Sequence, residues 1–286
     1  MSARIAGWWR SGLSRGVKVV YLVLLANGVP AFLILTFAPG STDDLFVWTI
    51  QPEASAQLLG VMYGNALLLV AIGLAQPSWG RARVTVVVIA FFSVAATIVT
   101  LFNLDPFLAH PWFHLAYWLS MYVVLFFAAP FVLITEERAH GGRLPVDVPL
   151  GRAARAIGAC GALACGAIGV ALLVSPSFVS DLWPWSLTPL VARILGVWLC
   201  ALALAYAWAL WDRDGVRTGP IFVQGVVTGP ALGLVPLLHS ADLREDVAPE
   251  LALYLGLAGL LALGGVLGLR AARSTATARE AAAHAR

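Results

Sequence analysis

The sequence has little charge. Only 12% of its 286 residues are charged and 60% are hydrophobic, whereas an ordinary soluble domain has about 25% charged residues. This composition excludes a typical soluble globular protein. It also excludes a disordered chain, because disorder requires low hydrophobicity together with high net charge. The mean hydropathy of +0.86 instead indicates a membrane protein with several spans.

Motifs of the common enzyme chemistries are also missing from the sequence. It contains no Gly-rich phosphate loop, no Cys-x-x-Cys pair and no serine nucleophile elbow. Its three cysteines fall inside apolar stretches and provide no disulfide framework. We therefore predict no cofactor, and these absences favour a protein that is not an enzyme.

Apolar runs long enough to cross a bilayer are abundant. A transmembrane helix needs roughly 20 mostly apolar residues, and eight stretches meet this requirement. They cover residues 18–38, 57–75, 84–102, 112–134, 155–174, 190–211, 220–238 and 250–269. The predicted fold class is an all-α integral membrane protein with eight transmembrane helices.

The distribution of basic residues predicts the orientation of these spans. With the N-terminus in the cytoplasm, 16 of the 18 Lys and Arg residues fall in inner segments, and only Arg193 and Arg244 fall outside. Cytoplasmic loops are enriched in Lys and Arg, so both termini are predicted to be cytoplasmic. The net charge of +3 follows from this bias and requires no nucleic-acid partner.

Composition and charge together predict the location and the lipid contacts. A chain rich in Ala, Gly and Arg favours a bacterial source, and hence the bacterial cytoplasmic membrane. Basic residues at the inner face, such as Arg152 and Arg155, predict contacts with anionic lipid head groups. A membrane-protein partner or a second copy of the chain are further expected partners.

Landmarks in the two halves of the sequence recur at a nearly constant spacing. Two Trp-x-x-x-Pro segments, Trp48–Pro52 and Trp185–Pro189, lie 137 residues apart. Three further pairs lie 136 to 138 residues apart, namely Pro39 and Pro176, Gly60 and Gly196, and Pro111 and Pro249. Because a unit of four spans is even, two such units would share one orientation and be related by a pseudo-two-fold axis along the membrane normal.

The repeat predicts the domain organisation. Residues 1–134 form the first four-span repeat with a basic N-terminal segment, and residues 155–270 form the second repeat. Residues 135–154 form a cytoplasmic linker, and residues 271–286 form a cytoplasmic tail.

One segment of the second repeat resembles a known pattern. The stretch Trp185-Ser-Leu-Thr-Pro-Leu-Val-Ala-Arg193-Ile-Leu-Gly196 is similar to a Trp-x-Leu-Thr-Pro-x-x-Ala-Arg-x-Leu-Gly segment that begins a span in a family of uncharacterised bacterial multi-pass membrane proteins. The first repeat departs from this pattern, with Gln57 at the position of Arg193. The resemblance implies a membrane protein and adds no activity.

Uncharged polar residues within the spans are candidate ligand-binding residues. The span cores hold no Asp, Glu or Lys, the residues that mark proton relays and ion-coupling sites, and this disfavours an ion-coupled transporter. Asn27, Asn65 and Gln224 are therefore candidates for a ligand cleft. The Asn27–Pro30 segment is predicted either to kink its helix or to break it, because Pro30 removes a backbone hydrogen bond.

Three residues of the predicted outer segments are further candidates for the cleft. They are Trp48, Trp185 and Arg193. The alternative is that the tryptophans lie at the lipid–water interface, where Trp is enriched. Arg193, at the outer end of its span, is then expected to reach the interface or to pair with Asp181.

Histidines in the predicted outer loops are candidates for a metal site. His110 and His114 are four residues apart and share one helix face, and His239 occupies the corresponding loop of the other half. Two histidines and a third ligand can hold zinc. The alternative is that these side chains are hydrated at the interface.

Three functions remain open on the sequence. The first is a non-enzymatic membrane protein that packs, scaffolds or binds a small apolar ligand, favoured by the neutral span cores and by small-residue ridges such as Gly225, Gly229 and Gly233. The second is a transporter or permeation path along the pseudo-two-fold axis, which requires the three amide residues to converge on one cavity. The third is an outer-face metal-binding or redox subunit.

Overall fold

The long helices of the structure agree with the predicted spans. The computed structural model describes residues 12–284, and their side chains as far as residue 271. Within this range eight helices are long and apolar enough to cross a membrane, and no strand forms. This confirms an all-α fold with membrane-spanning helices. Most of the basic N-terminal segment expected before the first span falls in residues 1–11, outside the described residues.

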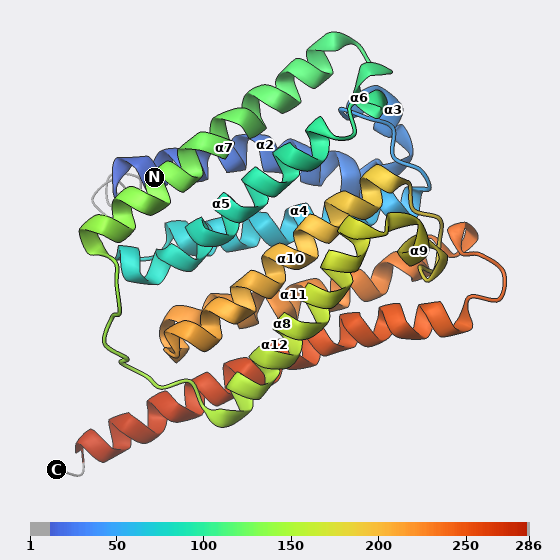
Figure 1. The fold of residues 1–286 in the computed structure, drawn as a ribbon. Helices are drawn as coiled ribbons and strands as arrows, with labels where there is room; N and C mark the ends of the chain where they lie inside the picture. Colours follow the sequence, from blue (N-terminus) through green and yellow to red (C-terminus); the bar gives the residue numbers. More distant parts are fainter. Residues whose placement is uncertain (1–11, 285–286) are drawn as a thin grey trace.

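The helix boundaries lie within a few residues of the predicted spans at most ends (Figure 1). The long helices are α2 (Arg15–Phe37), α4 (Glu53–Leu74), α5 (Trp79–Leu101), α7 (Trp112–His140), α8 (Arg152–Val174), α10 (Pro189–Asp212), α11 (Gly215–Leu238) and α12 (Ala248–His284). Short helices lie in the connections, namely η1 (Pro39–Ser41), α3 (Thr42–Leu45), α6 (Asp105–Leu108), α9 (Pro176–Asp181) and η2 (Ser240–Asp242).

Polar caps explain why several helices begin before the predicted apolar window. The Ser14 hydroxyl accepts a hydrogen bond from the backbone N–H of Val17 at the start of α2. The Asp214 carboxylate accepts two hydrogen bonds, from the backbone N–H groups of Val216 and Arg217 in the first turn of α11. Such caps pair backbone N–H groups that have no partner within the helix. The α2 helix then continues without a break through Pro30, so the structure favours a continuous helix over a discontinuous one.

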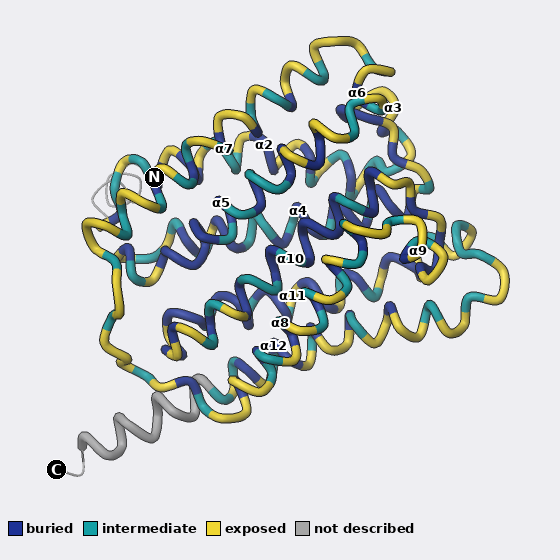
Figure 2. Tube along the Cα trace, viewed as in Figure 1, coloured by how far each residue is buried: buried dark blue, intermediate teal, exposed yellow. Residues whose placement is uncertain are grey.

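Helix pairs build the bundle. The pairs α2–α4, α5–α7, α8–α10 and α11–α12 pack side by side, and the first half of the chain meets the second where α5 packs on α10 and α4 packs on α11. Helices α5 and α10 are the most central, with 67% and 72% of their apolar stretches buried, as Figure 2 shows by the dark blue along both.

The connections divide between the two ends of the bundle. The start of α2 and the end of α12 lie at one end, called here the termini end, together with the α4–α5, α7–α8 and α10–α11 connections (Figure 1). The short helices α3, α6 and α9 lie at the opposite end, called here the α9 end.

The outer surface of the bundle is apolar. Large side chains such as Phe127 and Phe131 of α7 and Leu253 and Leu263 of α12 are 60–68% exposed. A large exposed apolar surface of this kind is unfavourable in water and suits contact with lipid. It is consistent with the eight apolar helices of a multi-pass membrane protein.

Candidate functional site

A cavity lies between the helices near the middle of the bundle. Residues of α2, α4, α5, α7, α10 and α11 line it, and it encloses about 60 Å³ open to water-sized molecules. This is enough for a few waters, since one water needs about 10–15 Å³. Asn27, Asn65 and Gln224 all line this cavity. The structure therefore brings together the three amide residues that were candidates on sequence.

Each of the three amide side chains makes a hydrogen bond to another residue of the bundle through one of its two polar atoms. The Tyr117 hydroxyl donates to Oδ1 of Asn27 at 3.1 Å, and the Thr228 hydroxyl donates to Oδ1 of Asn65 at 2.8 Å. Nε2 of Gln224 donates to the backbone carbonyl of Asn65 at 3.3 Å. All three amide residues are buried. The bonds to Thr228 and Gln224 also tie α4 of the first half to α11 of the second.

The rest of the cavity wall is apolar and aromatic. The rings of Phe92 and Trp198 lie with centroids 4.0 Å apart, and Tyr63 meets Trp198 edge-on at 5.5 Å. The hydroxyls of Tyr63 and Tyr122 are hydrogen-bonded at 3.1 Å. None of the described residues that line the cavity is charged. Apolar walls with a few converging polar groups are the usual form of a site for a small neutral molecule.

Trp48 and Trp185, which begin the two Trp-x-x-x-Pro segments, lie in the hydrophobic core and do not line the cavity. Trp48 is 1% exposed and packs edge-on against Trp118 at 5.1 Å, and Trp185 is fully buried and packs against Tyr254 at 5.2 Å. The indole N–H of Trp185 donates to the Ser55 hydroxyl at 3.1 Å. Both side chains therefore pack inside the protein rather than at a lipid interface.

Arg193 bridges the two halves at the α9 end. Its Nη1 donates to Oδ1 of Asn103 at 2.6 Å. Asp181, the partner considered on sequence, instead lies beside Arg244, which donates to its backbone carbonyl at 2.7 Å. Arg193 does not line the cavity.

The three histidines occupy two separate places. The rings of His110 and His114 have centroids 5.7 Å apart, and Nε2 of His110 lies 3.1 Å from the Thr49 hydroxyl. His239 lies near two carboxylates, 3.9 Å from Glu53 and 3.8 Å from Asp242. Among the described residues, no group of three or more His, Cys, Asp or Glu side chains is arranged to hold a metal ion.

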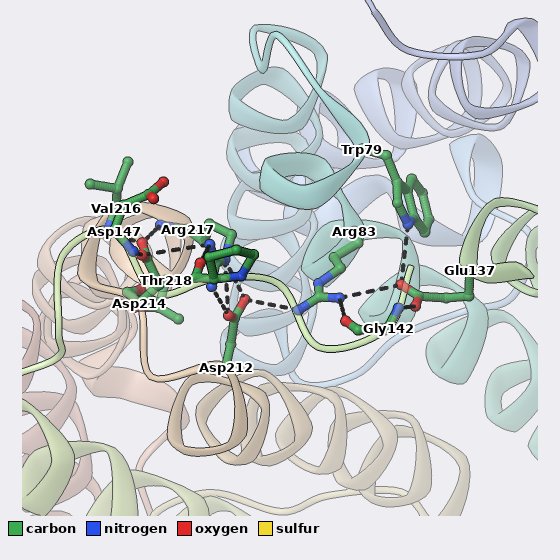
Figure 3. Close-up of polar contacts among 11 residues, drawn as sticks. Trp79, Arg83, Glu137, Gly142, Asp147, Asp212, Asp214, Val216, Arg217 and Thr218 are labelled. Carbon is green, nitrogen blue, oxygen red and sulfur yellow. Dashed lines mark hydrogen bonds and ion pairs between the residues drawn. The ribbon is translucent and has the colours of Figure 1, made fainter. Parts of the chain in front are cut away.

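A cluster of charged residues at the termini end was not singled out on sequence. Arg83, Glu137, Asp212, Asp214 and Arg217 form this ionic cluster, which Figure 3 shows. The guanidinium of Arg83, 1% exposed, lies 3.3 Å from Asp212 and 3.8 Å from Glu137. Arg217 binds Asp212 at 2.5 Å and lies 3.6 Å from Asp214. Glu137 also accepts a hydrogen bond from the indole N–H of Trp79 at 3.2 Å, and Figure 3 draws this contact beside Arg83.

The ionic cluster also holds the segment that joins the two halves. Arg83 donates to the carbonyl of Gly142 at 2.9 Å, and Arg217 donates to that of Pro145 at 2.8 Å. The Asp214 carboxylate accepts from the backbone N–H groups of Asp147 and Val148 at 2.7 and 3.1 Å. Every member therefore has at least one charged or hydrogen-bonding partner, and among the buried polar atoms of these five side chains only Nε of Arg83 lacks one. The arrangement suits holding helices and linker together rather than binding a ligand.

The sequence held a partial signal for this cluster. Arg83 and Arg217 were counted only as inner positive charges, yet the spacing of Asp214 and Arg217 at the start of one helix allows an i, i+3 contact. The contact between Arg83 and Asp212 joins residues far apart in the chain, and no local pattern reports it.

Comparison of the chain with family models, curated proteins and solved structures finds no match in any of the three. The resemblance of the Trp185–Gly196 segment to a bacterial membrane-protein family therefore stays a prediction.

Proposed function

We propose that this is a non-enzymatic membrane protein that binds a small neutral molecule in the cavity between its helices. One observation carries the proposal: three amide residues on three different helices, Asn27, Asn65 and Gln224, line one otherwise apolar cavity. Buried polar groups in an apolar wall are costly unless they are paired. Their convergence on one space therefore favours a site with an occupant.

The test is to fill the cavity. Ala66 lines it and is half-buried, so Ala66→Leu should occupy the space that the ligand needs. Ala116→Leu adds the same volume on an exposed part of α7 and serves as the control. Native mass spectrometry of gently purified protein should show a bound small molecule in the wild type and the control, and at least tenfold less in Ala66→Leu. A wild type with no bound molecule would contradict the proposal.

A permeation path between the halves is the second candidate. Residues that lie 136 positions apart, Asn65 with Ala201 and Val88 with Gln224, line the same cavity. The cavity thus lies where the two halves meet, as a path along the pseudo-two-fold axis requires. Proteoliposomes should then take up glycerol or urea faster than empty liposomes, and Ala66→Leu should remove the difference. Equal rates with and without protein would exclude this candidate.

We infer that the two halves are structural repeats, and matching contacts support this. The Thr42 hydroxyl bonds both the N–H and the C=O of Ile50, at 3.0 and 3.2 Å. The Ser180 hydroxyl makes the same pair of bonds to Leu187, at 3.1 and 3.2 Å. The two hydroxyl residues are 138 positions apart and their partners 137 apart, close to the offset of the sequence landmarks.

Helix pairing supports the same inference. The packing of α2 on α4 corresponds to that of α8 on α10, and α5 on α7 corresponds to α11 on α12. Between the halves, the contact of α4 with α11 corresponds to that of α10 with α5. This exchange of equivalent helices is the pattern that a two-fold axis produces, because each contact between the halves then occurs twice.

We propose that the termini end faces the cytoplasm of a bacterial cell. The predicted excess of basic residues in inner segments supports this orientation, and exposed Arg152 and Arg155 in the first turn of α8 suit anionic lipid head groups. In a variant without the native cysteines, exposed Glu245→Cys in the α11–α12 connection should react with an impermeant maleimide on intact cells, and exposed Ala139→Cys in the last turn of α7 should react only after lysis. The reverse labelling pattern would contradict the orientation.

A further inference from the structure

We propose that the molecule held in the cavity carries a neutral group that both donates and accepts hydrogen bonds, a hydroxyl or a carboxamide, and that Gln224 and Trp198 recognise this group. The inference rests on the proposed function and names the chemistry of its ligand. Two buried polar atoms that lack partners carry it.

Both recognising residues line the cavity, and each has one polar atom without a hydrogen-bond partner among the described residues. These atoms are the carbonyl Oε1 of Gln224 and the indole Nε1 of Trp198. The indoles of Trp48, Trp183 and Trp208 are also unpaired, but those residues do not line this cavity. In the hydrocarbon region no bulk water pairs such groups. A ligand that accepts from Trp198 and donates to Gln224 would satisfy both.

The hydrogen bonds around the cavity determine which ends of the amides remain for a ligand. Gln224 uses its Nε2 on the backbone carbonyl of Asn65, which leaves its oxygen as the acceptor. Asn27 and Asn65 use their side-chain oxygens as acceptors for hydroxyls, which leaves their NH₂ groups as donors. The cavity thus offers donors together with one buried acceptor that has no partner, Oε1 of Gln224, and a group that only accepts would leave that oxygen unpaired.

The absence of charge among the described lining residues makes the ligand neutral. An ion at this depth would have to be desolvated without a counter-charge, which is strongly unfavourable. A hydrocarbon fits the apolar wall but pairs neither free atom. A small alcohol or amide has an apolar body for the wall and a head group for both atoms.

Three probes of five heavy atoms each separate these possibilities: butan-1-ol, propanamide and diethyl ether. Butan-1-ol and diethyl ether are isomers, and the ether accepts hydrogen bonds but cannot donate one. Each probe is titrated into the full-length protein in phosphatidylcholine nanodiscs with ¹⁵N-labelled tryptophan. The resonance of the Trp198 indole N–H, assigned with Trp198→Phe, reports occupancy.

We expect butan-1-ol or propanamide to shift the Trp198 resonance at concentrations at least about tenfold lower than diethyl ether, because the ether leaves a buried acceptor unpaired. Whichever of the two binds more tightly identifies the head group. In Gln224→Leu the alcohol and the ether should act at similar concentrations, because no acceptor remains to be paired.

The outcomes distinguish this inference from the proposed function. If the ether binds the wild type as well as the alcohol and the amide do, and Ala66→Leu abolishes binding of all three, the inference is wrong while the cavity remains a binding site. If no probe shifts the Trp198 resonance, the inference fails on its own, and the co-purification test of the wild type decides the proposed function separately. The comparison within the wild type does not depend on the folding of any variant.

Discussion

Asp214 joins the start of α11 to the linker through one carboxylate. Its Oδ1 accepts from the backbone N–H groups of Val216 and Arg217 at 2.9 and 3.0 Å and so caps α11. Its Oδ2 accepts from two residues of the linker. Burial acts to raise the pKa of this carboxyl, but the backbone donors and the nearby Arg217 outweigh burial, so its pKa lies below the ordinary value.

The lowered pKa of Asp214 predicts how stability changes in acid. A carboxyl with a depressed folded-state pKa contributes stability that is present above its unfolded pKa of about 3.9 and is lost as the pH falls through the folded pKa. At pH 7 the free energy of unfolding of Asp214→Asn should therefore be about 1–3 kcal/mol lower than that of the wild type. The variant should accordingly unfold at a lower temperature. The difference should narrow as the pH falls from about 5 towards 3.

Thermal unfolding in detergent at several pH values measures this difference. Asp43→Asn removes an exposed carboxylate of α3 and is the control, for which we expect little change at any pH. A wild-type advantage over Asp214→Asn that stays constant down to pH 3 would show that ionisation of Asp214 contributes nothing.

Single residues of the candidate site were predictable to different degrees. Asn27, Asn65 and Gln224 could be selected because polar residues at mid-span are rare and tend to face the protein interior. The burial of Trp48 and Trp185 was not predictable from their residue type, because Trp near the end of a span equally suits the interface. What decides their position is an aromatic partner on a distant helix, Trp118 or Tyr254.

Close helix contacts depend on glycines at matched places in the two halves. A methyl group at Gly60 would lie 2.6 Å from Oγ1 of Thr36 and 2.9 Å from the backbone of Leu35, where α4 crosses α2. A methyl group at Gly196 would lie 2.8 Å from the backbone oxygen of Gly169, where α10 crosses α8. At both crossings the backbone of the facing helix leaves no room for a side chain.

We therefore expect Gly60→Ala and Gly196→Ala each to destabilise the protein, by about 1–3 kcal/mol, because overpacking forces the helices apart. Gly233→Ala is the control, since no atom lies within 4 Å of an added methyl there. That change should be neutral or slightly stabilising, because Ala is the better helix former by up to about 1 kcal/mol. Thermal unfolding compares the three variants, and equal effects at all three positions would show that these crossings are not tight.

The glycine ridge of α11 was partly predictable. The four-residue spacing of Gly225, Gly229 and Gly233 predicts one packing face. Gly225 and Gly229 do lie against α12, because a methyl group added at either would be 2.5 Å from a backbone oxygen of that helix. A methyl group added at Gly233 would have no atom within 4 Å. The spacing predicts which face of a helix carries only small residues. The point at which another helix crosses that face depends on the partner helix, so the local sequence does not predict it.

For the whole molecule, the sequence predicted the eight helices but not the contacts that join the halves. Hydropathy is a local property, so each span is visible in its own residues. The contacts of Arg83 with Asp212 and of Arg193 with Asn103 join residues that are far apart in the chain. These contacts depend on how the two halves pack against each other, and the composition of the chain does not predict that packing.

The ionic cluster predicts how the halves are held to the linker. Arg83 is buried, contacts the Asp212 carboxylate and donates to the carbonyl of Gly142 in the linker. Arg83→Gln should therefore leave Asp212 with one charged partner fewer and remove one hydrogen bond that holds the linker. Breaking a buried ion pair costs about 3–5 kcal/mol. The linker carries an exposed arginine, Arg143, so trypsin should cut the variant there much faster than the wild type. The cut would give fragments of residues 1–143 and 144–286.

Arg81→Gln provides the matched control for this prediction, because it removes an exposed arginine two residues away on the same helix. It should unfold and be cut at Arg143 as the wild type is. Gel electrophoresis of a trypsin time course in detergent, together with thermal unfolding, measures both effects. Faster cutting in both variants would attribute the change to lost surface charge, whereas faster cutting in Arg83→Gln alone identifies the buried guanidinium as the group that fastens the linker to both halves.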